Sequence, residues 1–250
     1  MNGNERLEAA LDTGDSLLLM PITMMAAADH IGVPYLKYAT DARVLAQAQC
    51  SIATAYDFDH VSVISDPAVE AADCGAKVAY HPDQPPAIDE LAAVLADKSV
   101  LADLTSPDPG SSERMGNRID GVRRLAEQVG DERVVEGWVE GPCAEGADLR
   151  GINRLMMDFF DDPAFVRDLF EFVIDLEIRF AIEQVAAGAR IIGIGDAAAS
   201  LVGPSIYSSF VYEFEKRLVD AVHAAGAVSR LHICGNITDS LAAIGTLGCG

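Results

Sequence analysis

Residues 190–234 read RIIGIGDAAASLVGPSIYSSFVYEFEKRLVDAVHAAGAVSRLHIC, and this stretch decides the fold. Its two ends, Arg190–Ile194 and Val228–Cys234, are short apolar runs of the kind that form buried strands. Between them, a helix is predicted to begin at Ser205 and to end at Gly226. A strand, a helix and a strand of this combined length predict a right-handed crossover between two parallel strands.

The rest of the chain alternates apolar runs with amphipathic stretches in the same way. A helix capped by Asp41 is expected to run to about Tyr56. Another is expected to begin at Asp162, where a proline follows as the first helical residue, and to end at Gly188. Three more apolar runs, bounded by Gly, Pro or Asp, predict buried parallel strands: Ser16–Met20, Val61–Ser65 and Val134–Val139.

These strands and helices predict an α/β fold of the (β/α)8 TIM-barrel type, with a doubly wound sheet as the runner-up. Five strands are countable where a closed barrel needs about eight, so we expect a barrel truncated after about five β/α units. Residues 1–250 are expected to form a single (β/α) barrel domain lacking its C-terminal strands, with residues 1–15 as an N-terminal helical lead-in. The proline-rich stretches Tyr80–Pro86 and Ser106–Ser112 are expected to be surface loops.

Charge and cysteine content narrow the class of protein. The chain carries 39 acidic and 18 basic residues, a formal net charge of −21, and clustered cations that could neutralise nucleic-acid phosphates are absent. No run of about 18 apolar residues is present, and the N-terminus lacks the basic-then-apolar order of a signal peptide. Five cysteines without a disulfide spacing are expected to be reduced thiols. We therefore expect a cytoplasmic protein that binds neither nucleic acid nor membranes.

Polar residues follow the predicted strands at their carboxyl ends, where a parallel barrel places its active groups. They are Asp66, Glu140, Asp196, His232 and Cys234. Asp66 precedes Pro67, so its carboxylate either caps the helix that carries Glu70 or acts at the barrel mouth. Glu70 either interacts favourably with the N-terminal dipole of that helix or contacts the substrate. Glu140 precedes a Gly-Pro turn and is either a solvated turn residue or a pocket carboxylate, and we favour the pocket.

Asp196 ends the segment Gly193-Ile194-Gly195-Asp196, which lacks the third glycine of a dinucleotide-binding fingerprint. Glycines at a strand end that let a ligand approach closely suit the segment better, with Asp196 pointing into the barrel mouth. We therefore take Asp66 and Asp196 as the candidate catalytic residues, and Glu70 and Glu140 as the candidate substrate-binding residues.

His232 and Cys234 lie two residues apart in a predicted strand, which places both side chains on one face. Imidazole nitrogen and thiol sulfur are ligand atoms that Zn²⁺ favours. The two residues are therefore candidate metal ligands. A satisfied histidine beside an inert thiol is the alternative, since two ligands alone do not complete a zinc site.

Several segments follow one another in the order seen in the uroporphyrinogen decarboxylase superfamily. They are Ile64-Ser65-Asp66 with Val69-Glu70-Ala71 and Gly75, Glu140-Gly141-Pro142, Gly195-Asp196-Ala197 with Ala199-Ser200 and Gly203-Pro204, and Leu231-His232-Ile233-Cys234-Gly235-Asn236. The resemblance covers essentially the whole chain. Its His-x-Cys-Gly-Asn element resembles the branch of cobamide-dependent (methylcobamide:thiol) methyltransferases.

This resemblance implies a (β/α)8 barrel and a zinc ion held by His232, Cys234 and a further cysteine. That cysteine is expected about a third of the domain further on, beyond Gly250, and Cys249 is too close to Cys234 to match it. The resemblance also implies a methyl group carried as methylcobamide by a corrinoid partner protein. The acceptor would be a small thiol, such as coenzyme M, or tetrahydrofolate.

Two alternatives are open. A uroporphyrinogen decarboxylase-like lyase would place its catalytic aspartate at Asp66, but where such decarboxylases carry an arginine-rich element the sequence has the apolar stretch Leu19–Ala26. Among Arg6, Arg43 and Arg114, none sits at a predicted strand end. The second alternative is a non-catalytic barrel module that binds a corrinoid protein or another partner.

Overall fold

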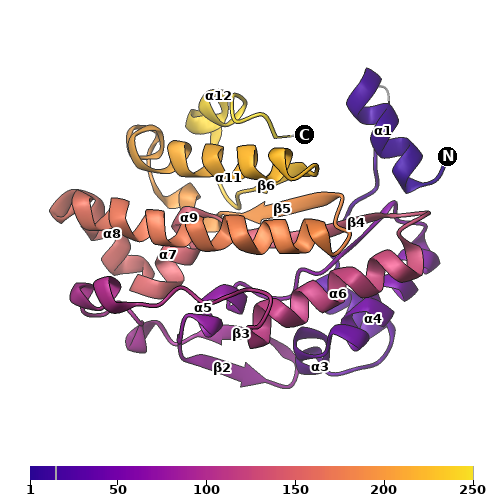
Figure 1. Cartoon of the computed structure of the whole chain (residues 1–250), viewed down its shortest axis with the longest axis horizontal. Coiled ribbons are helices and arrows are strands. Elements are labelled where there is room, and N and C mark those ends of the chain that lie inside the picture. Colours follow the sequence, from indigo (N-terminus) through magenta and orange to yellow (C-terminus); the bar gives the residue numbers. More distant parts are fainter. Residues whose placement is uncertain (15, 250) are drawn as a thin grey trace.

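Four parallel strands form the main sheet of the protein, in the order β1-β4-β5-β6 (Figure 1). The structure is a computed structural model that describes residues 1–14 and 16–249. The strands are β1 (His60–Ser62), β4 (Val134–Glu140), β5 (Ile191–Gly195) and β6 (Val228–His232). In their register Ser62 lies opposite Glu136, Trp138 opposite Gly193, and Gly195 opposite His232. A separate antiparallel hairpin is formed by β2 (Val78–His81) and β3 (Gln84–Ile88).

Helices connect and cover these strands. The α-helices are α1 (Gly3–Thr13), α2 (Met24–His30), α3 (Tyr35–Thr40), α4 (Ala42–Tyr56), α5 (Val69–Asp73), α6 (Glu113–Val129), α7 (Pro142–Arg150), α8 (Ile152–Asp161), α9 (Pro163–Ala186), α10 (Pro204–Ile206), α11 (Tyr212–Ala224) and α12 (Leu241–Ile244). Shorter turns are η1 (Glu90–Ala92), η2 (Lys98–Asp103), η3 (Ala197–Leu201), η5 (Thr238–Ser240) and the π-helical η4 (Tyr207–Val211). α6 and α9 run side by side along the sheet, with α7 and α8 gathered at one end of α9 (Figure 1).

The crossover predicted for residues 190–234 is confirmed. β5 and β6 pair in parallel. α11 lies between these two strands in the sequence and packs on α9 and on β6. The helical stretch is less regular than the single helix predicted from Ser205, because the π-helical turn η4 joins α10 to α11. The predicted caps are also confirmed: the Asp41 side chain accepts the Arg43 N–H, and the Asp162 side chain accepts the Phe165 N–H.

β4 is a central strand whose seven residues are all buried. Glu136, Trp138 and Glu140 alternate onto one face of the sheet, which we call the inner face. Against the opposite face packs α9, whose Gln184 donates to the Trp138 carbonyl oxygen (2.8 Å) and accepts from the Trp138 N–H (2.9 Å). Because β1 ends at Ser62, these bonds satisfy backbone groups of β4 that have no partner in β1.

The strand predicted at Ser16–Met20 is wrong. Leu17 is 92% exposed, and the backbone of this run makes single bonds rather than a ladder: the Asp59 N–H donates to the Leu19 carbonyl oxygen, and the Leu19 N–H donates to the Asp59 side chain. Leu18 and Met20 instead pack against a small apolar cluster beside the sheet. An apolar run alone does not distinguish a strand from a segment that anchors two side chains.

The loop predicted at Tyr80–Pro86 is also wrong, since this stretch turns between β2 and β3. Pro85 and Pro86 lie in a hairpin of two strands, where an edge position leaves the missing N–H without consequence. Ser106–Ser112 is irregular as expected and leads into α6. α1 lies within the predicted lead-in 1–15, whose last residue, like residue 250, is outside the described residues.

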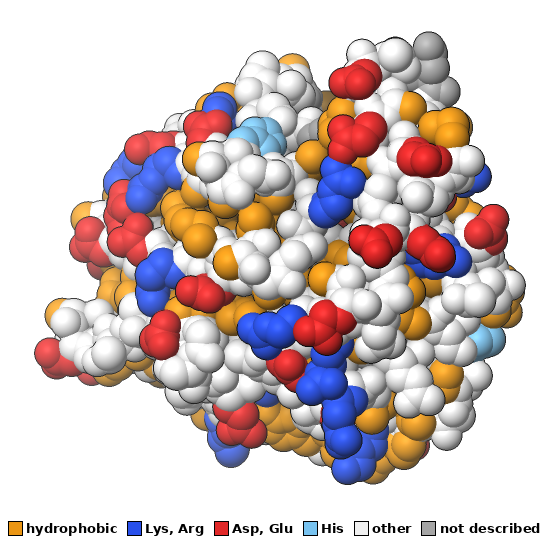
Figure 2. All heavy atoms as spheres, turned by 45° about the vertical axis from the view of Figure 1, so that its right-hand side comes forward, with side chains coloured by type: hydrophobic (Ala, Val, Ile, Leu, Met, Phe, Trp, Pro, Cys, Tyr) orange, Lys and Arg blue, Asp and Glu red, His pale blue; other side chains and the backbone are white. Residues whose placement is uncertain are grey.

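Charged and hydrophobic side chains share the surface of the protein (Figure 2). On the face shown in Figure 2, acidic and basic side chains are interspersed among hydrophobic ones. Within the described residues, no helix has the length and apolar character needed to cross a membrane.

Candidate functional site

The inner face of the sheet brings the candidate residues together around one indole ring. Trp138 lies against β5, where a Cβ added at Gly195 would be 2.9 Å from Trp138 Cζ2. Gly193 faces the same ring, so the two glycines leave the space that the indole occupies. Across β5, the His232 ring centroid is 6.3 Å from that of Trp138. The alternation of Gly193 and Gly195 therefore serves the packing of a tryptophan on the neighbouring strand.

His232 and Cys234 are neighbours at the carboxyl end of β6, as their spacing predicts. His232 Nε2 lies 3.0 Å from Cys234 Sγ, and both residues are exposed. The nitrogen and the sulfur atom thus lie within hydrogen-bond distance of each other, and solvent reaches both residues. This arrangement differs from the alternative of a buried histidine beside an inert core thiol.

Glu140 and Glu70 form a buried pair of carboxyl groups beside Trp138. The Trp138 indole N–H donates to Glu140 Oε1 (3.0 Å), and the Glu140 backbone N–H donates to Glu70 Oε1 (3.2 Å). Burial is the main cause that raises the pKa of Glu70 to about 8. Burial and then the nearby Glu70 raise the pKa of Glu140 well above its usual range. The site of Glu140 therefore favours the protonated form of its carboxyl group.

Asp66 lies at the end of the segment that follows β1, in an ion pair. Arg114 Nη2 is 2.7 Å from Asp66 Oδ2, and the Ser65 hydroxyl donates to the same oxygen (2.8 Å). Arg114 does not sit at a strand end, as expected, but its side chain reaches Asp66 from the first turn of α6. Arg118, one turn later, is also buried and donates to the backbone carbonyl of Val63.

Asp196 follows β5 and is fully buried against the first turn of α7. Its carboxylate accepts the Ala144 N–H (2.7 Å) and the Cys143 N–H (3.4 Å). The carboxyl group of Glu215 hydrogen-bonds to Asp196, and burial is the main cause that raises the pKa of Asp196 to about 7. Asp196 therefore holds α7 and α11 against the end of β5, one layer behind the surface that a ligand would touch.

Two adjoining cavities open at the carboxyl ends of the strands, and we call them together the strand-end cleft. The larger measures about 350 Å³ and is lined by Pro67, Glu90, Glu140, Ala144, Ala147, Asp148, Ile152, Ala197, Ala198, Ser200, Leu201 and Cys234. The smaller measures about 140 Å³ and is lined by Met24, Ile64, Asp66, Pro67, Trp138, Glu140, Gly195, Ala197 and His232. Glu140 borders both. Thus Asp66, Glu140, His232 and Cys234 meet at one cleft, whereas Glu70 and Asp196 do not line it.

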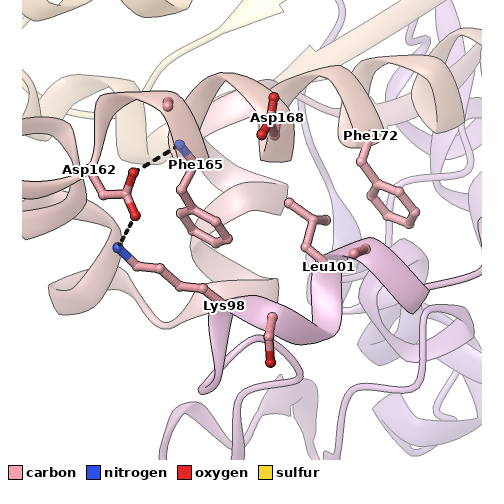
Figure 3. Close-up of a pocket in the computed structure, with 9 residues that line it drawn as sticks. Lys98, Leu101, Asp162, Phe165, Asp168 and Phe172 are labelled. Atoms are coloured by element: carbon pink, nitrogen blue, oxygen red, sulfur yellow. Dashed lines mark hydrogen bonds and ion pairs between the residues drawn. The ribbon is translucent and has the colours of Figure 1, made fainter.

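A third cavity of about 550 Å³ lies between η2 and the start of α9 (Figure 3). The Lys98 amine in this cavity forms ion pairs with Asp158 (2.6 Å) and Asp162 (3.0 Å). The same amine lies over the Phe165 ring in a cation–π contact. No predicted site residue lines it. Its size alone does not make it a functional site, because its cation has its partners within the protein.

The expected zinc ion needs at least three donor side chains. Across the described ranges 1–14 and 16–249, no three His, Cys, Asp or Glu side chains gather so as to hold a metal ion together. His232 and Cys234 remain a two-donor pair of the chemistry that zinc prefers.

Sequence reasoning missed Trp138, Asp148, Arg114 and Arg118 as parts of the site. The two arginines are one helical turn apart on α6, a spacing that places them on the same face. Asp148 lies two turns after the Gly-Pro turn that follows β4, on the helix that borders the cleft. Such residues come from helices rather than strand ends, so a search confined to strand ends does not find them.

The amino-acid sequence is similar to those of several known proteins. A family model described as uroporphyrinogen decarboxylase (URO-D) matches residues 16–250. The methylcobamide:CoM methyltransferase MtbA of Methanosarcina mazei is 31% identical over 212 residues, which are 83% of this chain and 61% of that protein. MtbA of Methanosarcina acetivorans is 28% identical over 199 residues, 78% of this chain and 57% of that protein. The uroporphyrinogen decarboxylase of Nocardia farcinica is 26% identical over 142 residues, 54% of this chain and 40% of that protein.

A solved structure shares the fold. The structure described as a methyltransferase from Methanosarcina mazei superposes with a TM-score of 0.83 at 21% identity, covering 100% of this chain and 74% of that chain. The predicted TIM-barrel type of α/β fold is thereby confirmed. The chain spans about three fifths of the length of the MtbA relatives that it matches.

Proposed function

Because the chain belongs to the uroporphyrinogen decarboxylase (URO-D) family, we propose that it moves a methyl group from a methylated corrinoid protein to a small thiol or to tetrahydrofolate. The observation that carries the proposal is the His232–Cys234 pair, 3.0 Å apart at the rim of the strand-end cleft. The similarity to two methylcobamide:CoM methyltransferases supports it. We further propose that the protein works in the cytoplasm.

His232 and Cys234 would hold a zinc ion. Imidazole nitrogen and thiolate sulfur are its preferred ligands, both side chains are exposed, and the two donor atoms lie 3.0 Å apart. Zinc supplies a positive charge that lowers the pKa of a nearby thiol, and a thiolate is a far better nucleophile than a thiol. The methyl group would arrive as methylcobamide on a corrinoid partner protein, and its chemistry belongs to that cofactor.

The remaining residues would bind and orient the acceptor. Glu140, fixed by the Trp138 indole, would hydrogen-bond to a ligand that occupies both halves of the cleft. Glu70 fixes Glu140 by accepting its backbone N–H. Asp66, held by Arg114, would offer a fixed negative charge to the smaller cavity. Asp196 acts through α7, which it ties to β5.

A decarboxylase function is the second candidate, favoured by the ion pair of Arg114 with Asp66 at the strand end. A substrate with several carboxylates needs free cations in the cleft. Neither Arg114 nor Arg118 lines it, and their guanidinium groups bind Asp66 and backbone carbonyls. The charge of the cleft therefore favours methyl transfer over decarboxylation of a polyanion.

The test is methyl transfer from free methylcobalamin to a small thiol, followed by the absorbance change of the corrinoid in the presence of Zn²⁺. We expect transfer by the parent chain and a loss of at least about 100-fold in Cys234→Ala and His232→Ala. Cys50→Ala on α4 and His81→Ala in the β2–β3 hairpin are matched controls that should keep the parent rate. A Cys234→Ala variant as active as Cys50→Ala would contradict the proposal, as would an inactive parent.

A further inference from the structure

Met24 has an unusual backbone conformation beside the smaller cavity of the strand-end cleft. Its φ is +26°, and among the described residues other than glycine only Asp57 (+54°) shares a positive φ. Asp57 is the C-cap of α4, a position and a residue type for which a left-handed backbone is ordinary. Met24 instead begins α2, where a positive φ crowds its Cβ against the backbone. The backbone at Met24 is therefore strained, and the surrounding structure must hold it in place.

The chain is fixed on both sides of Met24. Four residues earlier, the Met20 carbonyl oxygen accepts a hydrogen bond from Arg230 Nη1 (3.2 Å). Directly before Met24, the Thr23 hydroxyl accepts from Gln49 Nε2 (3.0 Å), so this N-cap side chain binds α4 instead of capping α2. After Met24, α2 packs on α3 and α4. These contacts prevent the segment from relaxing, so the strain at Met24 is kept.

The strained residue lines a narrow recess. Met24 is half-buried, packs against the apolar core, and lines the smaller cavity together with Trp138 and His232. The cavity volume of about 140 Å³ corresponds to about four or five water molecules at roughly 30 Å³ each. Small-molecule sites usually measure about 300 Å³ or more, so this recess holds one end of a ligand rather than the whole of it. Met24 is therefore part of the wall that decides which end can enter.

We propose that Met24 selects the shape of the thiol that reaches His232: a straight carbon chain next to the sulfur fits the smaller cavity, and a branched one is excluded by Met24. The inference rests on the proposed function for the thiol, and on the cavity for its shape. Glu140 borders both cavities, so a straight chain that starts beside His232 can continue into the larger cavity. Backbone strain that is held by surrounding contacts is typical of residues that clamp a ligand.

The experiment uses the metal-free chain and two isomeric ligands, butyl methyl sulfide, which is straight, and tert-butyl methyl sulfide, which is branched. The isomers contain the same atoms, so they gain similar free energy on leaving water and differ mainly in shape. Binding is followed by the fluorescence of Trp138, which is the only tryptophan of the sequence and lines the cavity. We expect the parent to bind the straight isomer at least about tenfold more tightly, and Met24→Ala to reduce this preference about tenfold.

Further variants test the assignment to Met24. Met25→Ala changes an exposed neighbour that is not among the described residues lining the cavity, and it should keep the parent preference. Met24→Leu has a side chain of similar volume and should also prefer the straight isomer. The proposal is overturned if Met24→Ala keeps the parent preference, if Met25→Ala loses it, or if neither isomer binds to the parent.

The strain has a test of its own. Met24→Gly removes the same side chain as Met24→Ala, but glycine adopts a positive φ without crowding. Met24→Gly should therefore have a Tm about 2–4 °C above that of Met24→Ala. A Tm equal to or below that of Met24→Ala would refute the strain on which the inference is built.

Methyl transfer tests the same selection with thiols. With Zn²⁺ and methylcobalamin, Met24→Ala should raise the rate with 2-methyl-2-propanethiol, relative to that with 1-butanethiol, about tenfold. The two proposals fail separately, because the sulfides carry no free thiol and their binding is measured without metal. The expected shape preference in a chain that transfers no methyl group would overturn the proposed function alone. Active methyl transfer with the same thiol preference in the parent and in Met24→Ala would overturn the inference alone.

Discussion

Replacing Arg114 with methionine removes the ion-pair partner of Asp66 while keeping most of the volume of the side chain. The Asp66 side chain has no exposed surface, and that of Arg114 is 7% exposed. Their atoms are 2.7 Å apart, so the pair is a buried salt bridge. Removal of one partner of such a pair costs about 3–5 kcal/mol because the other charge stays buried and unpaired.

The magnitude gives a measurable shift. At this chain length, about 4 kcal/mol corresponds to a fall in Tm of roughly 10 °C. Chemical denaturation of Arg114→Met should show the loss directly as a lower free energy of unfolding. Asp66→Asn removes the charge but keeps the contact with the Ser65 hydroxyl. The double variant should therefore be more stable than Arg114→Met alone.

A double-mutant cycle of Arg114→Met and Asp66→Asn measures the coupling energy between the two side chains. We expect the two changes to be non-additive by about 2–3 kcal/mol, in the direction that the second change relieves the first. Additivity to within about 0.5 kcal/mol would refute the claim that Arg114 and Asp66 stabilise one another. The same result would remove the argument that Asp66 is a fixed charge beside the cleft.

Three further predictions follow from local geometry. The pKa of Glu70 is raised to about 8 in the folded chain, from an unfolded-state value near 4.5. The contribution of Glu70 to the free energy of unfolding is therefore complete below pH 4.5 and falls as the pH rises toward 8. Glu70→Gln should remove part of this fall, roughly 2–4 kcal/mol between pH 4.5 and 8 by denaturant titration, and an unchanged pH profile would refute it. Gly195→Ala places a Cβ 2.9 Å from Trp138 Cζ2 and 3.0 Å from Glu140 Oε2, and should cost about 1–3 kcal/mol with an altered Trp138 fluorescence spectrum; a parent-like spectrum and Tm would contradict it. Asp162→Ala removes the acceptor of the Phe165 N–H at the start of α9 and should cost about 1 kcal/mol, measured against the parent, with no change in stability as the contrary result.

Much of the fold follows from the chain itself. The crossover from β5 to β6 follows from two apolar runs with a helical stripe between them, and the caps at Asp41 and Asp162 from residue type and position. The strand at Ser16–Met20 was predicted wrongly because an irregular segment that packs two apolar side chains, Leu18 and Met20, has the same local composition as a strand. The β2–β3 hairpin was missed because prolines hide an edge strand from a pattern-based prediction.

The candidate site was predictable only where it lies on strand ends. The pairing of His232 with Cys234 follows from the period of a strand, and their contact is confirmed by the 3.0 Å separation. The partners that come from helices, Arg114 and Asp148, depend on how α6 and α7 pack, which no local pattern specifies. The same packing turns Asp196 away from the cleft and toward the first turn of α7.

The central claim is that His232 and Cys234 together hold a zinc ion at the cleft where a methyl group is transferred. Its most direct test is a calorimetric titration of Zn²⁺ into the reduced chain, beside His232→Ala, Cys234→Ala and the control Cys50→Ala. We predict one zinc ion per chain for the parent and for Cys50→Ala, and binding at least about tenfold weaker in each of the other two variants. Zinc binding of the same strength in all four proteins, or in none of them, would contradict the claim.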